Sequence, residues 1–572
     1  MSEERISDIR DSQLVKNEPL IDDIDQNNKK NVSNKSKSRI IKIIIYIIII
    51  LLIISVITFV ILYFLLEDDK TKEEIIETDI IKATYYINNP SNSIKLFNEQ
   101  FIKKINSLEI EGKTYRNITN IFIFNTTGEK TIKINILKKQ ENLDYFFQNC
   151  KNLIDVDFNE MNSTKLKSIS GLFSGCTSLV NLNFSLINSN LENISYLFSD
   201  CKNLENVNLN NLETKNVIDM SGIFYNCFSL GSVDLKNFNT KNTSYLNKMF
   251  KGAINLRNIE FGDYFKISEA TDISELFYDC RSLETINLKY FETSKVKDMS
   301  YLFHNCIQLK SINLSNFNTK NLIEMSGMFS GCFSLENIYI NNLDTSNVVN
   351  MSYLFSSCTK LKNLNLENLN TSKVKNMKGM FYNCPSLISI NLSNFDTSFV
   401  TNMNSMFDLC TSLQSLNLKN FNTSNVLDMG YMFAGDINLT LIDFSINFNT
   451  SKVTNMNNMF FGCSSLEELN IINFDTNNAK SMMTMFKNCF SLKVLNISNF
   501  NTINANNMEY IFDMCYNLNI LDIRNFNSKS LIENSALLKN ISENGIIYYN
   551  SNIFNSYLIN KFFDKWEKID VK

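Results

Sequence analysis

Thirteen cysteines and a single histidine are the residues of this 572-residue chain best suited to metal binding or nucleophilic chemistry. Zinc sites need clustered ligands such as C-x₂-C, yet the cysteines here stand singly, and the closest two are Cys176 and Cys201. One histidine, His304, leaves almost nothing for catalytic triads or His-based acid–base chemistry, and we interpret it as a surface residue. The sequence therefore predicts a non-catalytic protein with no cofactor and no metal site.

The cysteines recur with a regular period of about 26 residues, which is typical of a repeat architecture. With Ala253 and Asp436 placed in two gaps, the chain has 15 equivalent positions. Phe precedes each of these positions by three residues, and Leu follows each by three. Cys shares an apolar stripe with Phe and Met, and stacked parallel side chains do not point at one another as a disulfide requires. We interpret the cysteines as buried free thiols.

Each repeat predicts two elements. The first is L-x-x-(L/I)-x-L, whose alternating end is typical of a short strand with one buried face. The second runs through Val348, Met351, Phe355 and Cys358, with offsets that place these residues on one stripe of a short helix. Thr345 and its equivalents would cap that helix at its N-terminus. This pattern predicts an α/β leucine-rich-repeat solenoid of about 15 coils, strand plus short helix, over residues 140–528.

The repeats also resemble a known family. The string "FNTSNVLDMGYMFAGDINLTLIDF" and its siblings follow the pattern F-x-T-x-x-V-x-x-M-x-x-M-F-x-x-C-x-x-L-x-x-L-x-L. This pattern closely resembles that of the BspA-like leucine-rich-repeat surface proteins. The resemblance covers about residues 140–528. It implies display on a cell surface and a role in adhesion or protein binding.

A membrane segment divides the chain. Residues Ile43 to Leu66 are 24 consecutive uncharged residues, long enough to cross a hydrocarbon core about 30 Å thick. Basic residues precede the segment, whereas seven acids and two lysines occupy residues 67–79. By the positive-inside rule, we predict a signal-anchor helix over residues 43–66 of a single-pass protein at the plasma membrane or cell surface. Residues 1–42 would be a disordered cytoplasmic tail, residues 67–78 a linker, and the repeats extracellular.

The two ends of the solenoid need caps, because a stack of coils exposes an apolar face at each end. Residues 79–139 contain short β-rich runs separated by turn signals, and we predict a small N-terminal β cap domain there. Residues 529–572 break the period and are predicted to form a C-terminal cap. In this cap, "GIIYYN" would be a strand and "NSYLINKFFDKW" a helix, with Trp566 packed against the last coil.

The strand surface is the remaining candidate for function. The residue between the two apolar strand positions should point outward to the concave face, and it is Asn or Asp in 13 of 15 copies. Two interpretations remain open: an Asn ladder that rigidifies the sheet, and a polar binding track. The candidate binding residues on this face are Lys310, Asn313, Lys362, Asn365, Asn391, Gln414, Asn417, Lys419, Glu467 and Asn470.

Charge and sequons limit the partners. The formal net charge of −4 gives no field that would attract nucleic acid, so we expect no nucleic-acid partner.

The sequence favours a membrane-anchored adhesion or recognition protein with an extracellular protein or glycan ligand. The alternative is a structural surface coat with no specific ligand. Candidate N-glycosylation sites are Asn117, Asn125, Asn193, Asn242, Asn422 and Asn540.

Overall fold

The computed structural model describes residues 33–71, 77–138, 140–161, 164–527 and 540–572. The chain divides into two compact units, one up to Ile76 and one from Glu77 onward. Most of the predicted cytoplasmic tail, residues 1–32, lies outside the described residues.

The first unit contains one long helix, α1, at Ser33–Thr71. Its stretch Ile40–Leu65 is 26 residues long and apolar enough to cross a membrane, with a length of roughly 39 Å at the usual helical rise. The described side chains of this stretch are exposed all round the helix, which suits a hydrocarbon solvent rather than water. The apolar N-terminal helix predicted from the sequence is thus confirmed.

The N-terminal cap is a β domain built from β1 to β6, with one short 3₁₀ helix. Its main sheet has the order β4-β3-β6-β1-β7, and β2 pairs with β5. Strand β7 belongs to the first coil and pairs antiparallel with β1, so the cap sheet covers the open end of the stack. The bounds are β1 Thr78–Ile87, β2 Ser93–Lys95, η1 Glu99–Lys104, β3 Ile105–Ile110, β4 Lys113–Tyr115, β5 Ile121–Ile123, β6 Gly128–Leu137 and β7 Leu153–Asp157.

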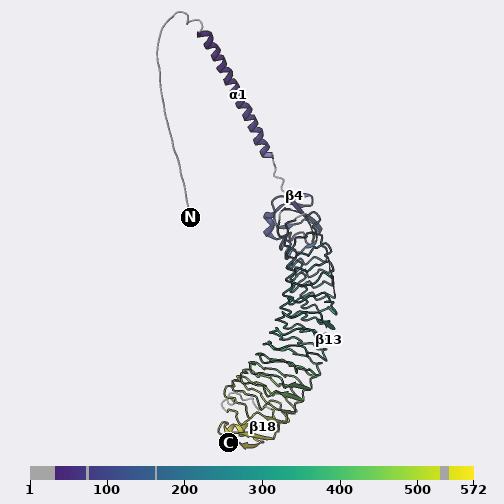
Figure 1. Ribbon diagram of the computed structural model, residues 1–572, viewed down its shortest axis with the longest axis vertical. Helices are drawn as coiled ribbons and strands as arrows, with labels where there is room; N and C mark the ends of the chain where they lie inside the picture. The colour runs from purple at the N-terminus through teal and green to yellow at the C-terminus, as the bar shows by residue number, and fades with distance from the viewer. Residues whose placement is uncertain (1–32, 72–76, 139, 162–163, 528–539) are drawn as a thin grey trace, which may run out of the picture. The chain divides into compact units, whose positions relative to one another are not determined.

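The second unit continues beyond the cap, where β4 is labelled, as the predicted solenoid, with coils stacked one on another through β13 to β18 (Figure 1). Neighbouring coil strands are parallel and in register, as in the pairing of Asn313 with Tyr339. A second line of fourteen parallel bridges joins 15 successive coils from Asn142 to Asn507. The coil strands are β8 Asn181–Asn183, β9 Asn206–Asn208, β10 Ser232–Leu235, β11 Asn258–Phe261, β12 Ser311–Asn313, β13 Asn337–Tyr339, β14 Ser415–Leu418, β15 Leu441–Phe444, β16 Glu468–Leu469, β17 Val494–Asn496 and β18 Ile520–Asp522.

The prediction of a short helix in each repeat is wrong. A series of tight turns occupies that part of the coil. Within one coil, the N–H of Cys306 bonds to the carbonyl of Phe303, three residues back, and Asn305 has a φ of 57°. Alternate N–H groups leave the coil, so that Phe303 donates to the carbonyl of Met328 in the next coil. A left-handed residue every four positions stops a helix from propagating. The same residues still face inward, since Met299, Phe303 and Cys306 are all fully buried.

The threonines that recur in each repeat also act between coils rather than as helix caps. Thr345 Oγ1 donates to the carbonyl of Asn370 and accepts the N–H of the same residue, both at 2.8 Å. The predicted N-cap role is therefore wrong, because there is no helix start for the hydroxyl to satisfy.

Asn and Asp side chains form the corners of each coil. In the coil around Cys358, Asp344, Asn350 and Asn365 each accept, through Oδ1, the N–H of the residue two positions later. Such Asx turns fix a bend without the special backbone freedom of Gly or the ring of Pro. Such turns, up to three in a coil, explain why 572 residues contain only 15 Gly and three Pro.

The C-terminal end extends the sheet before it closes the stack. β19, Ile546–Tyr549, pairs parallel with β18, and β20, Glu567–Asp570, pairs with β19. The predicted terminal helix is present as α3, Ser556–Phe562. Trp566 is buried, as predicted, and its Nε1–H donates to the carbonyl of Ser542 at 3.0 Å.

Replacing a glycine that lies under a tyrosine of the preceding coil tests the stacking of the turn segments. Gly327 has a φ of +58°, and a Cβ there would lie 2.5 Å from the ring of Tyr301. We expect Gly327→Ala to lower the free energy of unfolding by about 2 kcal/mol or more, measured by urea denaturation. Gly231→Ala is the control, because nothing lies within 4 Å of its Cβ position, and its change should stay within about 0.5 kcal/mol. Equal effects of the two substitutions would contradict this account.

Candidate functional site: the cysteine column and the strand face

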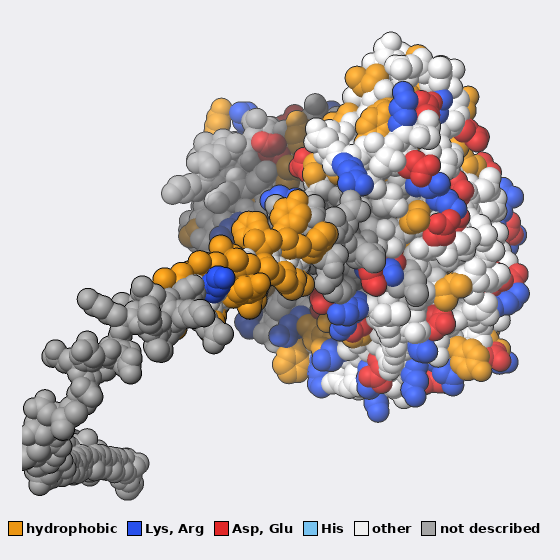
Figure 2. Space-filling model, turned by 90° about the horizontal axis from the view of Figure 1, so that it is seen from above, with side chains coloured by type: hydrophobic (Ala, Val, Ile, Leu, Met, Phe, Trp, Pro, Cys, Tyr) orange, Lys and Arg blue, Asp and Glu red, His pale blue; other side chains and the backbone are white. Residues whose placement is uncertain are grey.

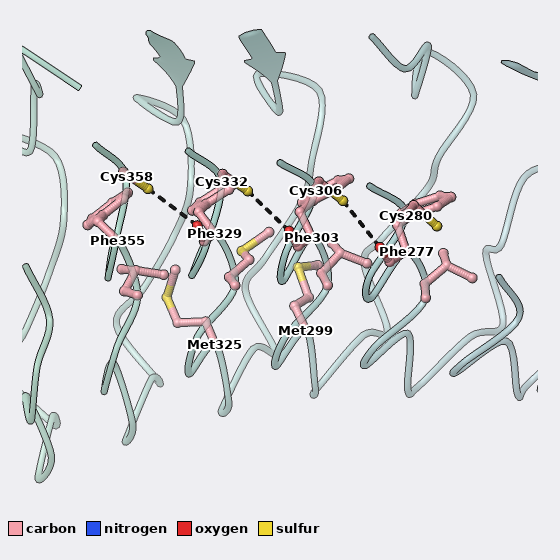
Figure 3. Close-up of a cluster of buried hydrophobic side chains, with 14 of the residues drawn as sticks. Phe277, Cys280, Met299, Phe303, Cys306, Met325, Phe329, Cys332, Phe355 and Cys358 are labelled. Carbon is pink, nitrogen blue, oxygen red and sulfur yellow. Dashed lines mark hydrogen bonds between the residues drawn. The ribbon is translucent and has the colours of Figure 1, made fainter. Parts of the chain in front are cut away.

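Phenylalanine and cysteine side chains form two parallel columns through the core. The 15 repeat phenylalanines stack in sequence from Phe147 to Phe512, with ring centroids of neighbouring coils 5.4 to 6.0 Å apart. Each cysteine thiol after the first donates a hydrogen bond to the phenylalanine carbonyl of the preceding coil. Figure 3 shows this for Cys306, Cys332 and Cys358, with Sγ–O distances of 3.2, 3.1 and 3.3 Å. The thiols therefore tie neighbouring coils together.

The thiols of the column are buried, and burial keeps them protonated. All 13 cysteines are free and buried. Burial raises the pKa of Cys332 to about 12, and those of Cys150, Cys384 and Cys515 likewise to about 12. Only a thiolate is an effective nucleophile or metal ligand, so these groups are inert in the folded chain. The methionine stripe, such as Met299 and Met325, is buried beside them as core (Figure 3).

One coil replaces the thiol by a carboxyl group. Asp436 is fully buried, and its Oδ1 accepts the N–H of Cys410 at 2.8 Å. Its second carboxyl oxygen has no hydrogen-bond partner among the described residues. Desolvation raises the pKa of Asp436 well above its usual range, with a further push from Asp408 and opposition from the Cys410 N–H. Asp436 therefore holds its proton in the folded chain.

His304, predicted as a surface residue, is half-buried. Its ring stacks on Tyr278 with centroids 4.5 Å apart and meets Tyr301 edge-on at 5.6 Å. Burial lowers the pKa of His304, so the imidazole is neutral near pH 7. Its surroundings are aromatic packing rather than a nucleophile or a ligand set. Among the described residues, no group of three or more His, Cys, Asp or Glu side chains is arranged as a metal would need.

We call the surface formed by the outward strand positions and their flanking residues the strand face. All ten candidate binding residues are exposed on it. The structure brings Lys362, Asn365 and Asn391 together on neighbouring coils, where they line two adjoining hollows. The others are distributed along the stack. Acidic and basic side chains are interspersed over the visible surface of the coils rather than separated by sign (Figure 2).

Several charged candidates are already paired with the neighbouring coil. Lys310 contacts Glu284 at 2.7 Å, Lys419 contacts Asp443 at 2.7 Å, and Glu467 contacts Lys493 at 2.6 Å. Exposed pairs of this kind contribute little, about 0 to 1 kcal/mol each. Their geometry nevertheless means that these side chains serve the stack as well as the surface, which the sequence alone could not reveal.

The outward Asn and Asp residues do not form a ladder along the sheet. In eleven coils the side-chain oxygen accepts the N–H of the residue two positions later, as in Asn313 to Ser315 at 2.9 Å and Asn391 to Ser393 at 3.1 Å. The ladder interpretation is therefore wrong, because these bonds stay within one coil and end each strand. The amide N–H groups of the Asn residues stay on the surface, where a partner could use them.

Sequence reasoning missed Tyr339. This residue occupies the outward position that is Asn or Asp in 13 of 15 copies, and it is 54% exposed. It lies beside a groove of about 440 Å³ that also involves Asn365 and Asn391. The break in the Asn pattern was the signal that could have found it.

The six candidate sequons differ in exposure. Asn117 and Asn125, in the N-terminal cap, are exposed, as are Asn242 and Asn540. The last two donate through Nδ2 to the carbonyl of Lys215 and to Asp513, respectively. The remaining two, Asn193 and Asn422, are half-buried and form Asx turns. Their glycosylation stays a prediction.

Thiol labelling tests the buried column. In the folded full chain at pH 8, iodoacetamide should modify none of the 13 cysteines, because burial keeps each thiol protonated and out of reach. After unfolding in urea without reductant, mass spectrometry should find all 13 modified. Labelling of the folded chain would contradict burial, and fewer than 13 labelled sites after unfolding would show disulfides.

The Asp436 carboxyl should make stability depend on pH. Below its usual pKa of 3.8 the group is neutral in both states, whereas above it the unfolded chain ionises and the folded chain does not. Stability therefore falls as pH rises, and Asp436→Cys should remove this loss and restore the thiol bond. We expect its advantage, from urea denaturation, to grow between pH 4 and pH 7 to about 1–3 kcal/mol.

Ala253→Cys is the matched control, because it adds a thiol at the other gap in the column without removing an acid. Its effect on the free energy of unfolding should be the same at pH 4 and pH 7. A flat pH profile for the Asp436→Cys difference would contradict the buried neutral carboxyl.

Comparisons with solved structures return leucine-rich-repeat proteins. One from Bacteroides ovatus is 20% identical, with a TM-score of 0.38, and the match covers 63% of this chain and 83% of that one. A leucine-rich cell surface protein from Faecalibacterium prausnitzii is 20% identical, with a TM-score of 0.31, covering 58% and 82%. A leucine-rich-repeat protein from Eubacterium ventriosum is 18% identical, with a TM-score of 0.27, covering 55% and 77%. No curated protein matches the chain.

A family model matches most of the chain. Its six overlapping matches span residues 91–205, 141–261, 185–285, 271–387, 353–447 and 442–546. They begin within the N-terminal cap and continue through the solenoid to the start of the C-terminal cap. The resemblance of the repeats to BspA-like leucine-rich-repeat surface proteins agrees with this repeated match. The chain belongs to the family described as "Mycoplasma protein of unknown function, DUF285".

Proposed function

We propose that this protein is a membrane-anchored surface protein that recognises an extracellular protein or glycan through its strand face. The observation that carries the proposal is the contrast between a constant core and a variable face. The buried Phe recurs in all 15 coils, whereas one exposed strand position reads Lys310, Glu336, Lys362, Ile388 and Gln414 in five successive coils. A rigid scaffold with variable exposed residues is the arrangement by which repeat proteins bind partners.

The charges that flank α1 support an orientation with the repeats outside the cell. Basic residues precede the apolar stretch, and seven acids with two lysines occupy residues 67–79. Basic flanks stay in the cytoplasm during insertion. We propose that the N-terminus is cytoplasmic and that the unit from Glu77 onward is extracellular.

A non-catalytic role is part of the proposal. The thiols are buried and protonated, and His304 packs between aromatic rings rather than beside a nucleophile. Function in repeat scaffolds depends on sites placed on the surface rather than on the fold itself. We propose that the strand face carries such a site, which binds a partner without chemical conversion.

Binding to intact cells that express the full chain tests the proposal. Labelled host-cell, matrix and microbial extracts should bind saturably, and protease added outside should remove both the repeats and the binding while sparing the N-terminal tail. Lys362→Glu should weaken binding about threefold or more, because this lysine lines the strand-face hollow and has no ion pair among the described residues.

Lys320→Glu is the control for that variant, because it makes the same charge change at an exposed lysine on a corner of the coil. Its binding should match that of the unmodified chain. No saturable binding to any extract, with dense self-packing on the membrane, would favour a surface coat. Repeats protected from external protease would contradict the orientation.

A further inference from the structure

Tyr339 breaks the repeat at a position where the side chain has a structural task. In eleven coils the Asn or Asp at this position accepts the N–H two residues later and so ends the strand. A tyrosine ring cannot form that Asx turn. The coil of Tyr339 therefore lacks a stabilising contact that its neighbours at Asn313 and Asn365 have. In place of that contact, the coil presents the Tyr339 side chain, which is 54% exposed.

The ring stands at the edge of a hollow rather than on a flat surface. A groove of about 440 Å³ runs across three coils, and its lining includes Tyr339, Asn341, Asn365, Glu367 and Asn391. Of its exposed lining side chains, Tyr339 is the aromatic one, and the others are amides, carboxylates and a serine hydroxyl. A second hollow of about 380 Å³ adjoins it through Glu336, Asn337 and Asn363, which line both.

Regular strand pairing is interrupted at the same place. In the described part of the chain, no strand lies between β13, which ends at Tyr339, and β14, which begins at Ser415. The two intervening coils are joined at their strand segments by one long hydrogen bond, from the N–H of Ile388 to the carbonyl of Lys362 at 3.5 Å. Peptide groups that pair regularly elsewhere in the sheet are therefore less fully paired beside the groove.

We infer that this groove binds a neutral glycan, with one sugar ring stacked on the face of Tyr339. The apolar face of a sugar ring fits an exposed aromatic face, while the hydroxyls at its edge need both donors and acceptors. Asn365 and Asn391 use Oδ1 in their Asx turns, which leaves their amide N–H groups as donors. The Glu367 carboxylate supplies acceptors.

The charges and the shortage of exposed apolar side chains favour this ligand over others. Glu336 and Glu367 are matched by Lys360 and Lys362, so the two hollows present no net field for a sulfated or sialylated chain. A protein partner would need a cluster of apolar or aromatic anchors at the centre of its contact. A single aromatic ring, that of Tyr339, surrounded by amide side chains suits a sugar better than it suits a protein surface. This inference rests on the proposed recognition function and assigns it a site and a ligand class.

The test uses the full chain in detergent micelles on an array of immobilised neutral, sulfated and sialylated oligosaccharides. Tyr339→Asn restores the repeat residue and its turn, so the variant should fold with an unchanged or higher midpoint of thermal unfolding. It should bind the neutral glycans at least about tenfold more weakly. Tyr339→Phe keeps the ring and should bind within about threefold of the unmodified chain. Tyr264→Asn removes another exposed tyrosine, 66% exposed and outside the groove, and should change nothing.

The site is supported if neutral glycans bind the unmodified chain, Tyr339→Phe and Tyr264→Asn similarly and bind Tyr339→Asn much more weakly. Unchanged binding in Tyr339→Asn would overturn the assignment of the groove. Binding of sulfated or sialylated chains alone, abolished by salt, would overturn the ligand class. Absence of all glycan binding would overturn the inference as well. In each of these cases the cell-binding experiment with extracts still decides the proposed recognition function separately.

Discussion

Contact between successive coils is the interaction on which the whole fold depends. A single coil cannot bury its apolar stripe, and it cannot pair its own backbone, because alternate N–H groups of its turn segment point to the coil beside it. Stacking supplies both at once. The Phe column, the thiol bonds from one coil to the preceding one, and the Thr hydroxyls that bridge coils all repeat the same contact from coil to coil. The free energy of unfolding then depends on the number of contacts between neighbouring coils more than on interactions within one coil.

This dependence explains why cysteine is used so often without any cysteine chemistry. The position needs a small side chain that tolerates complete burial and can still donate weakly to the carbonyl of the preceding coil. A thiol meets each requirement. Ala253 is smaller and lacks the donor, and Asp436 keeps a polar group but must hold its proton. Both substitutions are tolerated because thirteen other coils retain the full column.

The constant core leaves the strand face free to vary. Exposed strand residues contribute weak ion pairs such as Lys310 with Glu284, and Asx turns that end the strands, rather than buried contacts between coils. Tyr339 differs further, since it replaces a residue that ends a strand and lies beside a groove where regular strand pairing is interrupted. Stability therefore depends mainly on the inward positions, which hold the coils together, whereas the outward ones are exposed and vary in residue type.

The sequence by itself determined the solenoid, the number of coils, the buried column and the apolar N-terminal helix. Each of these is written in periodicity or composition, which depend on residues along one chain. Only the tertiary structure decided between helix and turns, because the spacing of Met299, Phe303 and Cys306 fits one face of a helix, and the observed turns bury the same three residues. It also decided the roles of Thr345 and Asn313, and it formed the groove at Tyr339. Those features depend on which group, in the same coil or the next, accepts a hydrogen bond, and on how neighbouring coils separate.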